Sequence, residues 1–358
     1  MNIKASGTSL KDMSETAGWR RVVMSKVLRD LDDPSLKGLD PHERERRILE
    51  NLLAACEDGL GSAGRPSVES HIHAQLRRYV VHVHAILVGA FVSAKKGEAE
   101  LKKLFAKRKL PPLWVPYCDP GFTLGANTWK FVKAYEKKYG GKPEIVFQGK
   151  HGVFVSADTK DKVLKVLYEV IETCRARIEK AGGKKKPVAK KSKTVSKNNT
   201  PDLTDSLLAE FDFLAKKHLG AEAGALHTQN VTTQNALANP KIKTILKTDG
   251  LTPDDLIYTN GRIVYLEKFD AKKIEAEFAK AMKGDGKPPL VYLLKNAGLF
   301  VIGREKMLPV IRDTALMTLQ VRILAERFGG ALTLTKRERD FIINWEVENY
   351  RFALINKK

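Results

Sequence analysis

The sequence predicts an α/β protein built from two domains, and three observations support this. Its 358 residues exceed the size of one average domain. Between residues 79 and 180, short segments rich in β-branched and aromatic residues alternate with longer segments of helical periodicity. The segment 181–200, AGGKKKPVAKKSKTVSKNNT, has almost no large apolar side chain and cannot form part of a core. We therefore expect domains at 1–180 and 201–358, joined by a basic flexible linker at 181–200.

The first domain is expected to alternate strands and helices. Strands are predicted at 79–85, 113–117, 145–148 and 153–156, and helices at 99–107, 127–139 and 161–180. The pair Gly140-Gly141 ends the second of these helices, and a tight turn at 149–152 joins the last two strands.

Part of the second domain resembles part of the first in sequence. The segments that begin at Glu144 and Pro289 both read as strand, glycine turn, strand and long helix. Gly152 falls on Gly298 and Phe154 on Phe300, whereas His151 falls on Ala297. Internal duplication and a chance likeness between two α/β segments both remain open.

Composition excludes several classes of function. The net charge is +21, but seven lysines without an acid gather between Gly183 and Lys197, and the other basic residues are mixed with acids. A solvated linker therefore explains the lysine run, and no specific nucleic-acid partner is expected. No segment is apolar and long enough for a membrane span or a signal peptide. Cys56, Cys118 and Cys174 form no CxxC pair, so a cytoplasmic protein without disulfides or a zinc–thiolate site is expected.

A pair of histidines predicts a metal site. His82 and His84 lie two residues apart on the predicted strand, so both imidazoles project to one side. His151 opens the tight turn ahead of Gly152 and is a suitable third ligand. Three imidazoles leave a coordination position open for water or substrate, and they suit zinc, with manganese, cobalt or iron as alternatives. An accident of packing is the alternative explanation for such a pair.

A second histidine pair is expected to be structural or to lie outside the ligand set. His71 and His73 fall in SVESHIHAQL, which is predicted to be a helix, where a two-residue step turns side chains about 200° apart. Pro66 and Ser67 mark the entry to this helix, with Ser67 as its expected cap. Glu69, in the first turn, is either a charge that complements the helix dipole or part of a site.

Four motifs in order carry a resemblance to a known family. PSVESHIHAQL, YVVHVHA, LWVPYCDPGFTL and GKHGVFV resemble the class II sugar-phosphate aldolases of the aldolase/adducin superfamily. The chain is most similar to the aldolase part of bifunctional rhamnulose-1-phosphate aldolase/alcohol dehydrogenases. That likeness extends to IKASGTSLKDM, LTPDDLIYT and the final RERDFIINWEVENYRFAL, although no dehydrogenase domain is expected after Lys358.

The resemblance implies a fold, a cofactor and a set of roles. The fold is a mixed, largely antiparallel sheet flanked by helices, with a second, smaller α/β unit after the linker. Zn²⁺, or another divalent metal, is held by His82, His84 and His151, and Glu69 is the catalytic acid/base. Ser6, Gly7 and Ser67 lie where the family binds the substrate phosphate. Relatives commonly form ring tetramers, so a homo-oligomer is expected.

The function expected from this resemblance is cleavage of a phosphorylated ketose, similar to rhamnulose 1-phosphate, into dihydroxyacetone phosphate and an aldehyde. The small-molecule partner is thus a sugar phosphate. A non-catalytic, adducin-like binding or scaffold protein and a sugar-phosphate epimerase are the alternatives. The family usually has a glycine- and asparagine-rich phosphate loop before the segment that resembles IKASGT, and this chain begins MNIKASGT. We therefore expect weak affinity for phosphate.

Overall fold

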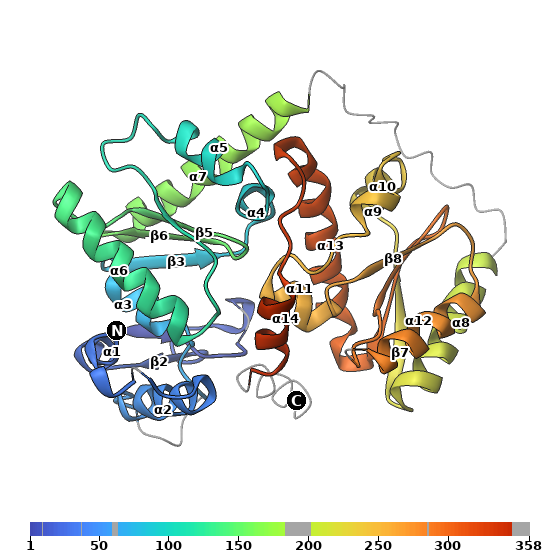
Figure 1. Ribbon diagram of the computed structural model, residues 1–358, viewed down its shortest axis with the longest axis horizontal. Helices are drawn as coiled ribbons and strands as arrows, with labels where there is room; N and C mark the ends of the chain where they lie inside the picture. Colours follow the sequence, from blue (N-terminus) through green and yellow to red (C-terminus); the bar gives the residue numbers. More distant parts are fainter. Residues whose placement is uncertain (9, 37, 59–63, 183–201, 285, 346–358) are drawn as a thin grey trace. The chain divides into compact units, whose positions relative to one another are not determined.

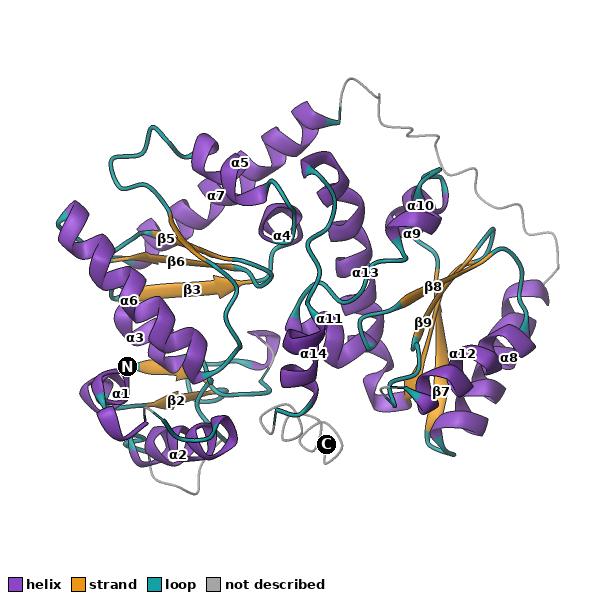
Figure 2. Ribbon diagram, viewed as in Figure 1, coloured by secondary structure: helices purple, strands orange, loops and turns teal. Residues whose placement is uncertain are grey.

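The computed structural model describes residues 1–8, 10–36, 38–58, 64–182, 202–284 and 286–345, which form two compact units (Figures 1 and 2). Unit 1 comprises 1–85, 101–171 and the described residues from Asp340 onward, and unit 2 comprises 86–100 and 172–339. Most of the predicted linker, 183–200, lies outside the described residues, so the linker and the domain limits at 180 and 201 stay predictions. No helix in the described parts of the chain is long and apolar enough to cross a membrane.

Unit 1 contains a mixed sheet of four strands in the order β3-β6-β5-β4. Its strands are β3 (Tyr79–Val83), β4 (Leu113–Val115), β5 (Ile145–Gln148) and β6 (Val153–Ala157), and a separate antiparallel pair is formed by β1 (Asn2–Lys4) and β2 (Trp19–Arg21). β3 and β5 both run antiparallel to β6, and β4 runs parallel to β5. The predicted mixed, largely antiparallel sheet flanked by helices is therefore confirmed.

Unit 1 also contains several helices. They are α1 (Met24–Asp32), α2 (Pro41–Ala54), α3 (Ser70–Gln75) and α6 (Phe122–Tyr139), with short 3₁₀ turns at Leu10–Asp12 and Pro34–Leu36, while α5 (Gly97–Leu104) and α7 (Lys160–Ala181) cross the boundary between the units. Ile72 of α3 and Val132 of α6 pack with Phe154 of β6 in one apolar cluster, so these two helices lie on the same face of the sheet.

Helix α6 begins at Phe122, earlier than the predicted Asn127. Gly121 and Gly125 make GFTLGA look like a loop in the sequence. Gly121 instead adopts φ +87° directly before the helix, and the backbone N–H of Phe122 donates to the Glu45 carboxylate. Gly125 allows close packing, because a Cβ there would lie 3.0 Å from Cβ of His71. Tertiary contacts thus extend the helix beyond its local signal.

Unit 2 contains a second sheet of four strands, in the order β7-β10-β9-β8. Its strands are β7 (Ala223–Thr228), β8 (Ile263–Leu266), β9 (Val291–Leu294) and β10 (Gly298–Arg304). Its helices are α4 (Ile86–Val92), α8 (Asp202–Leu219), α9 (Val231–Leu237), α10 (Ile242–Ile245), α11 (Pro253–Thr259), α12 (Ala271–Lys283) and α13 (Leu308–Ala325), with 3₁₀ turns at Glu305–Met307 and Glu326–Phe328, and α14 (Lys336–Ile343) crosses the unit boundary.

The two faces of this second sheet are covered by different helices. Phe211 of α8 and Phe278 of α12 pack with Ile302 of β10 in one core. The next residue along β10, Gly303, points to the other face, where a Cβ would lie only 2.6 Å from the Ile311 side chain of α13. This glycine lets α13 pack directly on the strand.

The LTPDD segment of unit 2 builds a buried ion pair. Thr252 caps α11 by accepting the N–H of Asp255 through its hydroxyl, with Pro253 in the first helical position. The fully buried Asp255 carboxylate then lies 2.9 Å from Nη2 of Arg322 on α13. The motif therefore has a structural role in the core of unit 2.

Candidate metal centre

Strand β3 positions the first two histidines. His82 lies opposite Phe154 in the β3–β6 pairing, and His84 follows the last strand residue, Val83. The strand is thus shorter than the predicted 79–85, but the two imidazoles still converge, with their Nε2 atoms 2.9 Å apart. His82 donates from Nδ1 to the carbonyl of Val153 at 3.1 Å, which leaves Nε2 with its lone pair toward His84.

A tight turn between β5 and β6 positions the third histidine. Lys150 adopts a left-handed conformation with φ +54°, and the N–H of His151 donates to the carbonyl of Gln148. The His151 ring then lies 5.1 Å from the ring of His82 and 4.7 Å from that of His84, measured between centroids. Candidate ligand atoms of the three histidines all lie within 4.8 Å of one another.

Gly152 is required by the close approach of these elements. A Cβ at this position would lie 2.7 Å from the Val83 carbonyl, 2.8 Å from the His84 ring and 3.2 Å from the His82 ring. Any larger residue would therefore push the turn away from the two strand histidines.

Glu69 reaches the same point from another element. It occupies the N-terminal boundary of α3, and its Oε1 lies 3.3 Å from Nε2 of His82 and 3.2 Å from Nε2 of His151. The prediction that Ser67 caps this helix is wrong, because Glu69 occupies the N-cap position. The Ser67 hydroxyl instead accepts the N–H of Glu69, two residues later in the sequence.

The electrostatics of the cluster keep the carboxylate ionised and the turn imidazole neutral. Burial raises the pKa of Glu69, but when His82 and His151 are protonated their charges and hydrogen bonds outweigh this and hold that pKa well below its usual range. Burial lowers the pKa of His151, despite the opposing effect of Glu69. A neutral imidazole and an ionised carboxylate are the forms that bind a metal ion.

This donor set fits a divalent cation. Three imidazoles and one carboxylate oxygen converge, and His82 is held in the required tautomer by a backbone carbonyl. Zinc ligands at their usual distances stand about 3.3 Å apart in a tetrahedron. Three of the separations, 2.9 Å between His82 and His84 and 3.2 and 3.3 Å from Glu69 to His151 and His82, are near that spacing, and the ligand atoms of the three histidines lie within 4.8 Å of one another.

His71 and His73 point in different directions, as the helical step predicts. His71 is buried and contacts the Asp30 carboxylate at 2.9 Å, so it joins α3 to α1. His73 packs edge-on against Phe154, the residue on which His82 stacks. Burial, together with repulsion from His82 and Lys4, lowers the pKa of His73 to about 4, against the opposing attraction of Glu69. The histidine therefore stays neutral behind the cluster.

The residues expected to bind phosphate lie on two adjoining segments. The N–H of Ser6 donates to the carbonyl of Arg65, and the N–H of Ser67 donates to the carbonyl of Lys4, so the strand end at 4–7 runs beside the segment 65–67. Gly7 adopts φ +77° and turns the chain away. Ser6 and Gly7 thus belong to a segment that runs beside the one holding Ser67, which lies two residues before Glu69 in the sequence.

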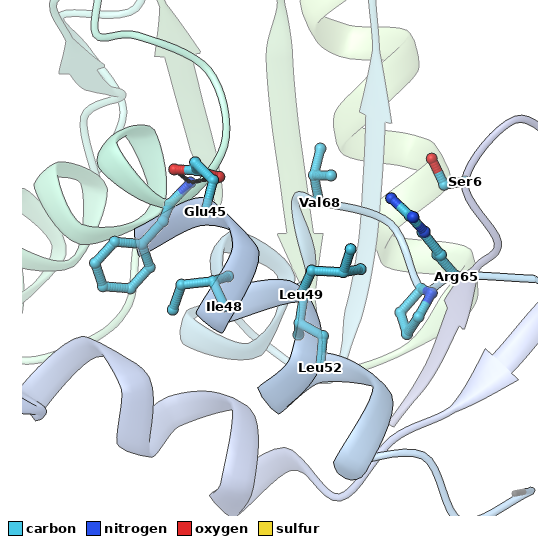
Figure 3. Close-up of a pocket in the computed structure, with 9 residues that line it drawn as sticks. Ser6, Glu45, Ile48, Leu49, Leu52, Arg65 and Val68 are labelled. Atoms are coloured by element: carbon cyan, nitrogen blue, oxygen red, sulfur yellow. Dashed lines mark hydrogen bonds between the residues drawn. The ribbon is translucent and has the colours of Figure 1, made fainter. Parts of the chain in front are cut away.

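Sequence reasoning missed two contributors to this region. Phe154 supports both His82 and His73, and Arg65 lines a pocket with Ser6 (Figure 3). Arg65 could have been found from the sequence, because it is a basic residue directly before the PSVE motif. The role of Phe154 could not, because it depends on the pairing of β6 with β3.

Comparison with known proteins identifies the class of domain. Residues 27–178 match the family model of the class II aldolase and adducin N-terminal domain. Over 131 residues the chain is 29% identical to the uncharacterized oxidoreductase YuxG of Bacillus subtilis (strain 168), a match that covers 34% of this chain and only 18% of that protein. The N-terminal class II aldolase domain of a conserved Thermoplasma acidophilum protein is 20% identical with a TM-score of 0.38, covering 49% of this chain and 73% of that structure.

The family match spans every residue of the three-histidine cluster and Glu69. Residues 27–178 are therefore similar to the class II aldolase and adducin N-terminal domain, which confirms the superfamily resemblance read from the motifs. The narrower likeness to rhamnulose-phosphate aldolases stays a prediction.

Proposed function

We propose that this protein is a metal-dependent aldolase that cleaves a phosphorylated ketose into dihydroxyacetone phosphate and an aldehyde. One observation carries the proposal: the Glu69 carboxylate lies within 3.3 Å of two of the three clustered imidazoles. A single point in the structure therefore offers both ligands for a cation and an ionised group that can move a proton.

His82, His84 and His151 are the residues that would hold the cation, for which zinc is our first choice. When bound, a divalent ion would act as a Lewis acid toward the oxygens of the substrate. Hydrogen bonding of His82 to the Val153 carbonyl and stacking on Phe154 would keep the ligand set in place.

The carboxylate of Glu69 would carry the proton in the reaction. As the carbon–carbon bond breaks, the hydroxyl at the leaving carbon loses its proton and becomes the aldehyde. The electron pair stays on the carbon beside the ketone as an enediolate, and protonation of that carbon completes dihydroxyacetone phosphate. The two proton movements balance, so no further reactant is needed. The low pKa of Glu69 favours its starting as the base.

The phosphate would bind where the chain segments around Ser6 and Ser67 meet. Ser6, Gly7 and Ser67 supply hydroxyl and backbone N–H groups there, and Ser67 is joined to Glu69 by a hydrogen bond. This connection supports a substrate that reaches from the phosphate contacts to the carboxylate. From the family resemblance we also expect a cytoplasmic homo-oligomer.

The test turns on Glu69→Gln. The variant should keep its fold and most of its metal, because the imidazoles supply the main binding, while turnover falls about 10²–10⁴-fold, the usual effect of losing a positioned acid/base. Solvent deuterium should exchange into dihydroxyacetone phosphate with the wild type and not with the variant. This readout is independent of the aldehyde, which is not identified.

Glu172→Gln, an exposed carboxylate on α7, is the matched control and should behave as the wild type. The aldolase proposal fails if the metal-loaded wild type neither exchanges deuterium nor cleaves any common ketose 1-phosphate. Epimerisation of a pentose phosphate in the same assay would point to an epimerase, and metal binding without any turnover would favour an adducin-like scaffold.

A further inference from the structure

Helix α3, which begins directly after Glu69, is too short to fix its own orientation. It has six residues, and helices of this length are not stable by themselves in water, so contacts with neighbouring elements must hold it. The N–H groups of Ile72 and His73 donate to the Glu69 carbonyl, which joins that residue to the first turn. Whatever orients α3 therefore also orients the backbone that carries the Glu69 carboxylate.

His71 is the polar side chain that joins α3 to α1. The residue is fully buried, and its Nε2 lies 2.9 Å from the Asp30 carboxylate. A carboxylate accepts hydrogen bonds, so the imidazole donates from Nε2. Within the described part of the chain, Nδ1 of His71 has no hydrogen-bond partner. The contact with Asp30 is therefore the hydrogen bond that orients this ring.

The surroundings of His71 leave its side chain little freedom. The Phe122 ring of α6 meets the imidazole edge-on, with ring centroids 5.5 Å apart. A Cβ at Gly125 would lie 3.0 Å from Cβ of His71, so the backbone of α6 approaches closely. Nε2 of Gln75 donates to the Gly125 carbonyl at 2.9 Å. Helix α3 is thus packed against both α1 and α6 (Figure 1).

Asp30 is itself held in place by a residue of a third helix. It is buried, with Oδ2 facing His71 and Oδ1 accepting a hydrogen bond at 2.8 Å from Nδ2 of Asn51 on α2. A buried carboxylate is unfavourable unless its oxygens are hydrogen-bonded, and here both oxygens have a partner. The hydrogen bonds therefore connect α2, α1 and α3 in series, and the series ends two residues from Glu69.

This polar series supplies direction, which apolar packing alone would not. Replacing both members of a buried polar pair by apolar side chains is often nearly neutral for stability, so stability does not require the pair. Hydrogen bonds, in contrast, restrict how far a helix can slide or turn on its neighbours. Glu69 needs such a restraint, because its Oε1 lies within 3.3 Å of two imidazoles. A displacement of about 1 Å is enough to spoil a catalytic arrangement.

We propose that His71, supported by Asp30 and Asn51, is a positioning residue that holds the Glu69 carboxylate against the three-histidine cluster. Its effect on turnover rests on the proposed function, whereas its effect on the place of Glu69 does not. His71 acts only through α3 and is not a ligand, so its loss should leave the three imidazoles able to bind a metal ion.

The full-length protein loaded with Co²⁺ tests the position of Glu69 without catalysis, because the visible absorption of Co²⁺ depends on the groups around the ion. His71→Leu should change this spectrum in the same way as Glu69→Gln, while the content stays at about one Co²⁺ per chain. His71→Gln keeps an N–H donor toward Asp30 and should retain the wild-type spectrum. A wild-type spectrum in His71→Leu would overturn the proposal.

A double substitution separates positioning from a general loss of stability. Turnover in His71→Leu should fall about 10–100-fold, the effect of a misplaced catalytic group. His71→Leu combined with Glu69→Gln should be no slower than Glu69→Gln alone, because a misplaced carboxylate and an absent one are equivalent. Val163→Ala is the matched control: it shortens a buried side chain of α7 outside the apolar clusters that contact α3, so it should lower the unfolding temperature and leave turnover unchanged.

These measurements keep the two proposals apart. If His71→Leu slows an active enzyme by the same factor with and without Glu69, the positioning role is overturned and the aldolase proposal stands. A shared spectral change in His71→Leu and Glu69→Gln, in a protein without aldolase activity, would do the reverse. Should His71→Leu not fold, Asn51→Leu removes only the donor to Asp30 and should produce the same spectral change to a smaller extent. An unchanged spectrum in that variant would count against the proposal.

Discussion

The sheets of the two units have the same strand order and pairing, and they differ in the side chains at the end of the sheet where unit 1 has its three histidines. In both, the strand that is first in sequence lies at one edge and pairs antiparallel with the last strand, which pairs with the third, and the second strand runs parallel to the third. His82 lies opposite Phe154 in unit 1, and His227 lies opposite Phe300 in unit 2.

The likeness extends to the turn that carries the third ligand. Lys150 in unit 1 and Asn296 in unit 2 both adopt a left-handed conformation, with φ of 54° and 63°. A Cβ at Gly152 would meet a strand carbonyl at 2.7 Å, and one at Gly298 would meet the corresponding carbonyl, that of Thr228, at 2.8 Å. Of the two explanations that the sequence leaves open, these matches favour duplication, and we propose that unit 2 is a degenerate repeat of unit 1.

The difference between the units lies in a few side chains. Where unit 1 has His84 and His151, unit 2 has Gln229 and Ala297, and Nε2 of His227 contacts the Ala297 carbonyl at 2.6 Å. Among the described residues, the three histidines of unit 1 form the one group able to hold a metal ion. The comparison shows that the same sheet and turn occur with and without the three histidines, so the side chains at these positions decide whether a group able to hold a metal ion is present.

Removing the histidine ligands should have the largest effect, because it abolishes the proposed metal site that distinguishes unit 1 from unit 2. The protein should carry about one divalent ion per chain, and His82→Ala combined with His84→Ala should remove it, because two of three imidazole ligands are lost. Elemental analysis after dialysis measures this. His227→Ala is the matched control in unit 2, and His71→Ala should also leave the ion in place. Unchanged metal content in the double variant would rule out this site.

Adding histidines to unit 2 should create a second metal site if the two sheets are equivalent. Gln229→His combined with Ala297→His places imidazoles at the positions equivalent to His84 and His151, so the chain should bind a second ion. Its affinity should be lower than in unit 1, because His227 must first give up its contact with the Ala297 carbonyl. The visible absorption of added Co²⁺ reports the stoichiometry. A folded variant that still binds only one ion would show that these positions of unit 2 are not equivalent to the histidine positions of unit 1.

The units also bury carboxylates differently, which predicts a pH effect from unit 1. Asp255 of unit 2 faces Arg322, whereas burial raises the pKa of Glu45 in unit 1 to about 7, only partly offset by the Phe122 N–H. A carboxyl with a raised pKa stabilises the fold below its unfolded value and loses that contribution as pH rises through the folded value.

Glu45→Gln should therefore become more stable relative to the wild type between pH 5 and pH 8, by up to about 3 kcal/mol. Urea unfolding at the two pH values measures the change. Glu50→Gln, an exposed position on the same helix, should show no such gain. An equal difference between Glu45→Gln and wild type at both pH values would disprove the raised pKa.

The smallest expected effect compares the two turn glycines. Gly152→Ala and Gly298→Ala should each destabilise the protein by about 1–3 kcal/mol, the first by overpacking and the second also by its φ of +109°. Only Gly152→Ala should weaken metal binding, because its new methyl group displaces His82 and His84. Thermal unfolding and metal titration separate the two effects, and equal losses of metal affinity would show that the turn acts indirectly.

Local patterns in the sequence were sufficient for much of the fold. Strands 145–148 and 153–156 and the helix before Gly140 follow from periodicity and glycine punctuation, and the structure has them at or near these limits. The early start of α6 was not predictable, because a carboxylate on another helix accepts its first N–H group. The end of β3 at Val83 likewise depends on its partner strand.

The sequence by itself determined the candidate ligand types and the pairing of His82 with His84, because alternation along a strand is a local property. Only the tertiary structure decided that Glu69 joins them, since the carboxylate comes from a different element and sequence spacing does not measure distance through space. The same holds for His151, which is brought to the cluster by the register of β6 against β3, and for Arg65, whose carbonyl accepts the N–H of Ser6 from a distant part of the chain.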